Sequence, residues 1–360
     1  MCSRACCAIA VPVLAVLAAA VGSFVVDGQV WDLLPGWRVS DMPDLSGKVA
    51  IVTGPTLGGI GFESGVELAR RGARVVLAGR SRRKGEEALA ALKREVPAAK
   101  AEFAELDLGS LASVKKFADA FRARKVPLHI LLNNAGVMAP PFQLSADGLE
   151  SQFATNHLGH FLLTRLLLPA LEAGAPSRVV MVSSAAAFIP DALAAAARTL
   201  PANFTPELWS KGSDFSYLLR AEHEPRYHAF AAYGRSKLAN LLFARAFARR
   251  VRGKGIYSNA VHPGGIMTNL QVHVVNDFAG FSGRSLAEAI QSAVGRLLLS
   301  PKQGAVSQLF LATAPEVEAQ NIHGQFYRPQ ARPYSLPGLV TEELEEDLWQ
   351  LSEGLAAEYL

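Results

Sequence analysis

The sequence TGPTLGGIG, from Thr53 to Gly61, lies between a short apolar run and a longer amphipathic one. A glycine-rich turn at the end of a strand lets the backbone approach a pyrophosphate, and the N–H groups of the following helix face it. Gly54 and Gly59 also have the spacing of a P-loop, but Ile60 stands where that motif requires lysine. The stretch therefore favours a dinucleotide over a nucleoside triphosphate. The alternative is a tight turn without a ligand.

Outward from this turn, short apolar runs alternate with longer amphipathic ones, which is typical of a parallel sheet with crossover helices. Right-handed crossovers would make one doubly wound α/β (Rossmann) domain, with ligands at the carboxyl ends of the strands. We expect strands over 48–52, 73–78, 102–106, 128–132, 178–183 and 255–262, and helices over 60–71, 84–94, 113–121, 149–171 and 231–251.

The composition of the 360-residue chain is that of a globular protein, with 50% hydrophobic and 19% charged residues. The formal net charge of +4 is too small to indicate nucleic-acid binding. All three cysteines, Cys2, Cys6 and Cys7, lie in the first seven residues. The folded body therefore has no internal disulfide and no thiolate metal site.

The N-terminus carries an uncharged stretch of 22 residues, Ala5 to Val26. As a helix it would span about 33 Å, enough for a hydrocarbon core of about 30 Å. Its length favours a retained membrane anchor over a cleaved signal or part of a targeting sequence. We expect an anchor or signal over 1–27, a linker over 28–44, and association with the endoplasmic reticulum or another organelle membrane, with the orientation left open.

The end of the second expected strand distinguishes the two nicotinamide cofactors. Enzymes that use NAD place a carboxylate about 20 residues past the glycine turn, whereas the 2′-phosphate of NADP needs a cation there. Arg80 stands 19 residues after Gly61, and Arg82, Arg83 and Lys84 follow it. This pattern favours NADP(H). The alternative is a solvated basic start of a helix.

The spacing of one tyrosine predicts acid/base chemistry. Of the seven tyrosines only Tyr233 has a lysine, Lys237, four residues later. On a helix this spacing puts phenol and ammonium on one face. The ammonium would lower the phenol's pKa from about 10 and allow proton exchange with an alcohol or carbonyl oxygen. A surface contact is the alternative.

Six motifs follow one another in the order typical of the short-chain dehydrogenase/reductase superfamily. They are TGPTLGGIG, LLNNAGV (131–137), TNHLGHF (155–161), VVMVSS (179–184), YGRSK (233–237) and VHPGGIMT (261–268). The chain resembles this superfamily from about residue 45 to 327. ELDLGSLASV (105–114), SKLAN and DLWQLSEGL (347–355) are similar to its retinol dehydrogenase and WW-domain oxidoreductase branch.

The resemblance implies an NADP-binding domain over 45–330, a C-terminal extension with a helix over 331–360, and a role for each matching residue. Tyr233 would be the general acid/base, and Lys237 its pKa-lowering, ribose-holding partner. Ser184 would bind the substrate oxygen, and Asn156 would help hold the water of a proton relay. The implied cofactor-binding residues are Gly54, Gly59, Ile60, Gly61, Arg80, Asp107, Leu108, Asn134, Ala135, Tyr233, Lys237, Pro263, Gly264 and Thr268.

Two features depart from the family pattern. The glycine turn has one residue more than TGxxxGxG, and Tyr233 stands 49 positions after Ser184. The stretch 185–232 is expected to be an insertion or lid on the substrate side.

Two other clusters carry no ligand pattern. No Cys, Asp or Glu completes a metal set near His157 and His160, so no metal is expected. The acidic run 342–347 and the helix after it are expected to be a solvated surface helix.

These patterns together predict an NADP(H)-dependent oxidoreductase that interconverts a carbonyl and an alcohol on a lipophilic, retinoid-, steroid- or lipid-like substrate. The expected partners are this small molecule and a membrane, with no nucleic acid, and a homo-oligomer is compatible with the sequence. Two alternatives stay open. One is a catalytically silent dinucleotide-binding regulatory or scaffold protein, and the other is an epimerase or dehydratase of the extended type.

Overall fold

The structure, a computed structural model, describes residues 36–188, 227, 229–266, 298–338 and 340–360. The apolar N-terminal segment, Thr268 and most of the stretch 185–232 lie outside the described residues. None of the helices formed by the described residues is long and apolar enough to cross a membrane.

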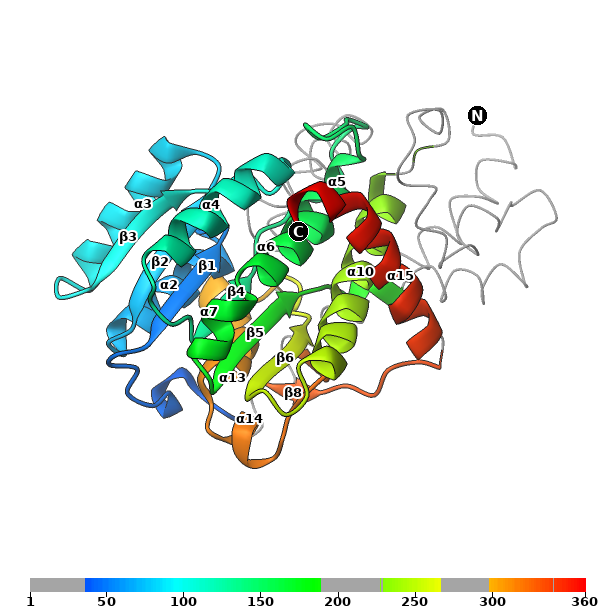
Figure 1. Cartoon of the computed structure of the whole chain (residues 1–360). Helices are drawn as coiled ribbons and strands as arrows, with labels where there is room; N and C mark the ends of the chain where they lie inside the picture. Colours follow the sequence, from blue (N-terminus) through cyan, green and yellow to red (C-terminus); the bar gives the residue numbers. More distant parts are fainter. Residues whose placement is uncertain (1–35, 189–226, 228, 267–297, 339) are drawn as a thin grey trace, which may run out of the picture.

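The described residues form an eight-stranded sheet in the order β3-β2-β1-β4-β5-β6-β7-β8 (Figure 1). All neighbouring strands are parallel except β7 and β8. The predicted doubly wound parallel sheet is therefore confirmed, with one antiparallel strand at its edge. The strands are β1 Val49–Thr53, β2 Arg74–Gly79, β3 Ala101–Glu105, β4 Ile130–Asn133, β5 Ser177–Val182, β6 Ile256–Val261, β7 Phe326–Arg328 and β8 Arg332–Pro333.

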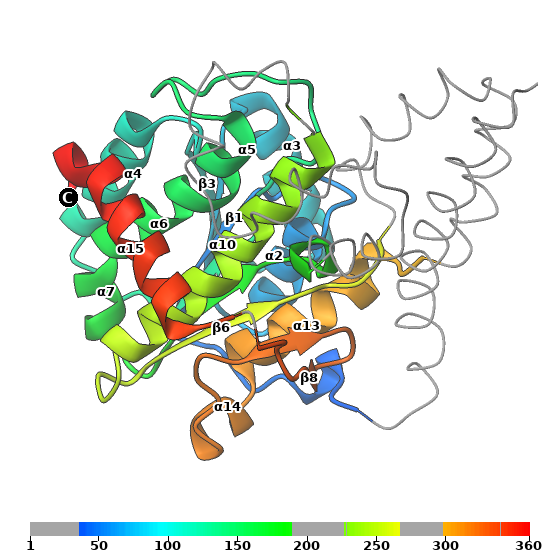
Figure 2. The same cartoon turned by 90° about the vertical axis from the view of Figure 1, so that its right-hand side faces the viewer.

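Helices cover both faces of the sheet, because alternate residues of the central strands point to opposite sides and both sides are buried. In β1, Ile51 belongs to the hydrophobic cluster shared with α4, α6, α10 and α15, whereas Ala50 and Val52 belong to the cluster shared with α2, α3 and α13 (Figures 1 and 2). These helices are α2 Ile60–Arg70, α3 Arg82–Glu95, α4 Leu111–Ala123, α6 Gly159–Leu166, α10 Ala229–Arg250, α13 Pro301–Thr313 and α15 Glu342–Ala356. Shorter elements are η2 Val39–Asp41, α5 Ser151–Phe153, η3 Ala154–Leu158, α7 Leu168–Ala173, η4 Ala185–Phe188, α14 Glu316–Ala319 and η8 Ala357–Tyr359.

The predicted single helix over 149–171 is wrong in detail. The segment is divided into α5, a π-helical turn (η3), α6 and α7, and the N–H of Gly159 reaches back to the carbonyl of Ala154. Pro169 lies in the first turn of α7, where a missing N–H costs nothing, so the chain restarts there after α6. A π-helical turn frequently marks a functional site, and this one contains Asn156.

The expectation of a solvated surface helix at the C-terminus holds for only one side of α15, because Glu342, Glu343 and Asp347 are exposed whereas the opposite side is buried. In α15, Leu348, Trp349 and Ala356 belong to the hydrophobic core, and the helix lies across α10 in Figure 2. The Glu345 side chain is fully buried and pairs with Arg245 and Arg249 of α10. A buried carboxylate needs such partners, and here they lie about a hundred residues earlier in the chain.

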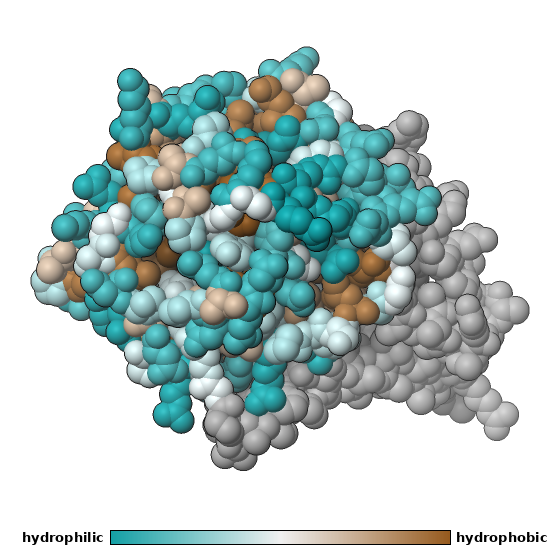
Figure 3. Space-filling model, turned by 60° about the horizontal axis from the view of Figure 1, so that its bottom comes forward, coloured by the Kyte–Doolittle hydropathy of each residue, from teal (hydrophilic) through white to brown (hydrophobic). Residues whose placement is uncertain are grey.

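The surface of the described residues leaves few large apolar side chains exposed, namely Leu57, Leu144 and Leu360. The face in Figure 3 is accordingly mostly hydrophilic, with apolar residues in small separate groups.

Candidate active site

Tyr233 and Lys237 lie one turn apart on α10 and are both buried. The Lys237 Nζ atom lies 5.7 Å from the centre of the Tyr233 ring and donates a hydrogen bond of 3.0 Å to the carbonyl of Val182. Asn240, another turn along, donates to the same carbonyl at 3.0 Å. One face of α10 is thus fixed to the carboxyl end of β5, where a parallel sheet binds its ligands.

The two serines that follow β5 have different partners. The hydroxyl of Ser183 donates to the main-chain carbonyl of Lys237 on α10 at 2.6 Å, so its proton is not available to a substrate. The hydroxyl of Ser184 accepts from the N–H of Ala186 at 3.1 Å and forms a hydrogen bond with the Tyr233 phenol. The structure therefore places the predicted serine, and not its neighbour, beside the tyrosine.

Asn156 is fully buried and joins three segments. Its amide exchanges two hydrogen bonds with the main chain of Val137, at 2.8 and 3.0 Å, and donates a third to Ser236 at 2.9 Å. A Cβ on Gly136 would lie 3.2 Å from both the Asn156 Oδ1 and the Lys237 Nζ atoms. The absence of a side chain at Gly136 therefore allows Asn156 and Lys237 to approach the same point of the backbone.

His160 connects this cluster to the turn after β1. Its Nδ1 atom lies 2.9 Å from the Asn156 carbonyl, which can only accept, so Nδ1 carries the proton. Burial lowers the pKa of His160 to about 3, so the ring is neutral and Nε2 accepts from the Thr53 hydroxyl at 2.9 Å. The same hydroxyl oxygen accepts from the N–H groups of Asn134 and Ala135, both at 2.9 Å. The predicted nucleotide-binding and acid/base residues thus share one hydrogen-bonded network.

In the protein without a cofactor, the pKa values of Tyr233 and Lys237 differ from those that the sequence predicts. Burial raises the pKa of Tyr233 to about 12, and the hydrogen bond with Ser184 only partly opposes it. Burial also lowers the pKa of Lys237 to about 8. The predicted lowering of the phenol's pKa by the ammonium is not present here, because Lys237 points at the Val182 carbonyl and desolvation dominates. The phenol holds its proton at neutral pH.

The glycine turn leaves room for an anion. At Gly54, with φ of +68°, a Cβ would come within 2.8 Å of Ala135 Cα, and at Gly61 it would collide with the Asn134 amide. Gly59 is the N-cap of α2 and supplies no side-chain cap, whereas Ser81 and Ser110 cap α3 and α4. The first turn of α2, which begins with Ile60 and Gly61, therefore has no side-chain cap from its N-cap residue, and its N–H groups fit a pyrophosphate.

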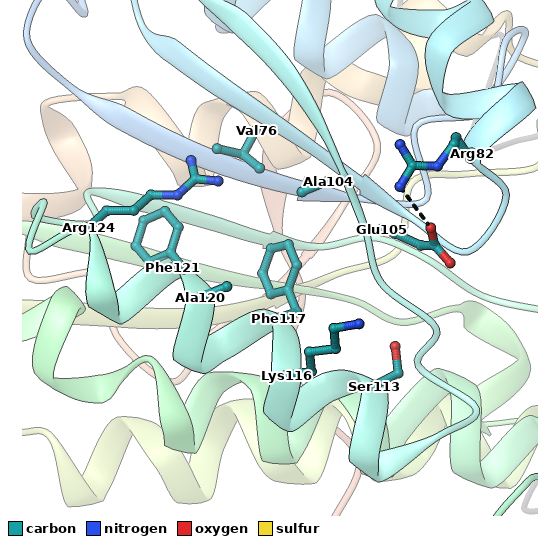
Figure 4. A pocket seen from close by; sticks show the side chains of 10 residues that line it. All are labelled: Val76, Arg82, Ala104, Glu105, Ser113, Lys116, Phe117, Ala120, Phe121 and Arg124. Atoms are coloured by element: carbon teal, nitrogen blue, oxygen red, sulfur yellow. Dashed lines mark hydrogen bonds and ion pairs between the residues drawn. The ribbon is translucent and has the colours of Figure 1, made fainter.

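The basic residues after β2 are not equivalent. Arg82 pairs with Glu105 at 3.3 Å at the rim of a pocket of about 300 Å³ between β3 and α4 (Figure 4), and Arg83 pairs with Glu87 at 2.6 Å. Arg80 is exposed at the end of β2 and forms no ion pair with any described residue. Of the arginines in this run, Arg80 is therefore the one that could bind a ligand without giving up an ion pair with a described residue.

The remaining predicted cofactor residues follow β3 and β6. One carboxylate oxygen of Asp107 accepts a hydrogen bond from the N–H of Gly109 at 2.9 Å. The other carboxylate oxygen could accept a hydrogen bond from a ligand. The Leu108 side chain packs into the core, so its contribution to a ligand is restricted to the backbone. Pro263 and Gly264 follow β6 at the same edge of the sheet as Ser184, and Gly264 has φ of +99°.

Sequence inspection overlooked four residues of this site: Thr53, Gly136, His160 and Ser236. All stand inside the quoted motifs or next to a predicted residue, so proximity in the sequence was the available signal. His157, the other histidine of TNHLGHF, contacts Ser352 at 2.8 Å, whereas His160 contacts Thr53 and Asn156 of this site. In the part of the chain that the structure describes, no group of three His, Cys, Asp or Glu side chains could hold a metal ion.

Comparisons with known proteins give a consistent result. The family model for short chain dehydrogenases matches residues 48–196. Mouse polyprenol dehydrogenase is 38% identical over 343 residues, with 93% of this chain and 91% of that protein covered. Human WW domain-containing oxidoreductase is 38% identical over 320 residues, covering 88% and 70%. Human retinol dehydrogenase 14 is 35% identical over 331 residues, covering 88% of each.

Among solved structures, an uncharacterized protein from Mycobacterium paratuberculosis superposes with a TM-score of 0.62. It is 33% identical, and the match covers 90% of this chain and 98% of that chain.

Proposed function

This chain belongs to the short-chain dehydrogenase/reductase family, in the branch of the WW domain-containing oxidoreductases and retinol dehydrogenases, and we propose that it interconverts a carbonyl and an alcohol on a lipophilic substrate with NADP(H). The observation that carries the proposal is the convergence of Ser184, Tyr233, Lys237 and Asn156 beside the carboxyl ends of β4 and β5. These residues belong to three separate segments, namely the end of β5, η3 and α10, and acid/base chemistry explains why they meet in one buried cluster.

Tyr233 acts as the proton donor when a carbonyl is reduced. Because its pKa lies near 12 in the chain itself, the phenol is protonated and can give a proton to an oxygen that gains charge. Ser184 holds that oxygen with its hydroxyl, and Lys237 supplies positive charge from below the ring. NADP(H), when bound, supplies or accepts the hydride. In the reverse direction the same phenol, once deprotonated, accepts the proton of the alcohol.

The cofactor residues are assigned by position. The pyrophosphate lies against the glycine turn, with Gly54 and Gly59, and the first turn of α2, which begins with Ile60 and Gly61. Arg80 binds the 2′-phosphate, because its guanidinium is exposed and unpaired among the described residues. Along the nucleotide lie Asp107, Leu108, Asn134 and Ala135, and on the nicotinamide side lie Pro263, Gly264 and Thr268.

The substrate class rests on two lines of support. The relatives include enzymes named for polyprenol and retinol, which are lipophilic alcohols. The uncharged stretch Ala5 to Val26 is long enough to anchor the protein in an organelle membrane, where such alcohols dissolve. We propose an anchor or signal over 1–27, a linker over 28–44, one enzyme domain over 45–330 and a C-terminal extension over 331–360.

The test is a screen of the full chain with NADPH or NADH against all-trans-retinal, a long-chain polyprenal and a small water-soluble aldehyde. We expect reduction of a lipophilic aldehyde with NADPH, and loss of at least about a hundredfold in kcat for Tyr233→Phe with NADPH affinity nearly unchanged. Nucleotide binding without turnover of any carbonyl would favour the scaffold alternative. Turnover by Tyr233→Phe at the wild-type rate would overturn the assigned mechanism.

A further inference from the structure

A buried carboxylate begins the segment that carries Asn156. Glu150 is 1% exposed and caps α5, accepting from the N–H of Gln152 at 2.9 Å and from that of Phe153 at 2.8 Å. Burial raises its pKa, and these hydrogen bonds oppose the shift. Within the described part of the chain no cation pairs with it. A carboxylate in this position depends on donors from the surrounding structure.

One such donor is Tyr227, which lies six residues before Tyr233. Its hydroxyl donates to Glu150 at 2.9 Å and accepts from the side-chain amide of Gln152 at 2.7 Å. Its ring packs edge-on against Phe142, with 5.1 Å between the ring centres. Burial and the neighbouring carboxylate raise the pKa of Tyr227, so the hydroxyl keeps the proton that it donates.

Gln152 uses its whole amide to join three segments. It donates to the carbonyl of Ala229, the first residue of α10, at 2.8 Å, and it accepts from the N–H of Ala139 at 2.8 Å. Its side chain is fully buried. No donor or acceptor of this amide is left without a partner, which is the condition under which a buried polar network fixes a geometry.

The contacts of Gln152 repeat those of Asn156 one helical turn earlier. Asn156 joins the same loop, through Val137, to the same helix, through Ser236. Gln152 stands four positions before Asn156, and Ala229 stands four positions before Tyr233, so each precedes a predicted catalytic residue by about one helical turn. Two parallel amide contacts, one turn apart, therefore fix the loop after β4, the segment 150–158 and α10 to one another.

We propose that Glu150, Gln152 and Tyr227 form a positioning junction that sets where Tyr233 stands relative to Asn156 and the substrate oxygen. The proposal rests on the proposed function, since it assigns these residues to the geometry of that reaction. They are positioning residues, because their hydrogen bonds reach Tyr233 only through the first turn of α10. Without the contact through Gln152, the first turn of α10 is held less firmly against the segment 150–158, and a displacement of about 1 Å at the reacting atoms can cost up to a hundredfold in rate.

The decisive variant is Tyr227→Phe, which removes one hydroxyl and leaves the ring against Phe142. We expect kcat for reduction of all-trans-retinal to fall about tenfold while the KM for NADPH stays within about twofold, since the junction touches no predicted nucleotide-binding residue. The matched control is Tyr257→Phe, because the Tyr257 hydroxyl forms no hydrogen bond with any described residue. This control should retain the wild-type kcat. Equal kcat values for both variants would overturn the proposal.

A second measurement needs no substrate. In the NADPH-bound protein, amide hydrogen exchange of residues 229–236 should be several-fold faster in Tyr227→Phe than in wild type, and unchanged in Tyr257→Phe. Unchanged exchange at the start of α10 would overturn the proposal even if retinal is not a substrate. Failure of the proposed function has a different signature, namely wild-type turnover by Tyr233→Phe or no turnover of any carbonyl.

Discussion

The hydroxyl of Ser183 donates a hydrogen bond to the main-chain carbonyl of Lys237, with 2.6 Å between the two oxygens. This contact fixes the centre of α10 to the end of β5 and leaves the next hydroxyl, that of Ser184, to face Tyr233. Two adjacent serines therefore serve different purposes, one in the structure and the other in the proposed reaction.

Replacing each serine by alanine should separate these purposes. We expect Ser183→Ala to lower the free energy of unfolding by about 1 kcal/mol, the net value of one buried hydrogen bond, with a small effect on kcat. Ser184→Ala should lower kcat by about tenfold or more with little change in stability. Urea unfolding and steady-state kinetics on both variants provide the measurement. The same ranking of the two variants in both assays would contradict the division.

The choice of cofactor should depend on Arg80. We expect Arg80→Ala to weaken NADPH binding about tenfold to a hundredfold and to leave NADH binding nearly unchanged, because only NADPH offers a phosphate for a charge-assisted hydrogen bond. Arg83→Ala is the control, since Arg83 is already paired with Glu87 at 2.6 Å. Titration of both nucleotides by fluorescence decides the point. A parallel loss of affinity for NADH would argue against phosphate recognition.

Carbonyl reduction should lose rate as the pH rises through about 8. Burial lowers the pKa of Lys237 to about 8, so its ammonium is present below that pH and is lost above it. The Tyr233 phenol, with its pKa near 12, stays protonated over this range. We expect kcat/KM at saturating NADPH to fall about tenfold per pH unit above 8. Lys237→Arg should lack this limb, because a guanidinium stays charged. A flat profile between pH 7 and 10 in the wild type would be incompatible with this assignment.

Stability should fall in mild acid because of three buried histidines. Burial lowers the pKa of His157, His160 and His262 to about 3 from the ordinary value of 6.5. The unfolded chain therefore binds protons that the folded chain cannot, so the stabilisation present above pH 6.5 is lost as the pH falls towards 3. Urea unfolding at pH 7 and 4.5 measures the difference. His157→Gln should reduce it, and equal free energies at both pH values in the wild type would show that these rings are not the cause.

Local patterns in the sequence determined the alternating strands and helices, the glycine turn and the Tyr233–Lys237 pair. Each is a property of a few neighbouring residues: a short apolar run for a buried strand, a spacing of four along a helix, or a group of glycines between a strand and a helix. For that reason the sheet and the residues that meet at its carboxyl edge could be predicted before any coordinates.

The tertiary structure alone decided the features that depend on distant partners. It bound the Ser183 hydroxyl to the Lys237 carbonyl, placed a π-helical turn at Asn156, buried Glu345 between two arginines of α10 and brought Tyr227 to Glu150. The members of these pairs lie 54 to 100 residues apart. No sequence period carries information over that separation, because it is the packing of whole helices against the sheet that determines which buried polar groups meet.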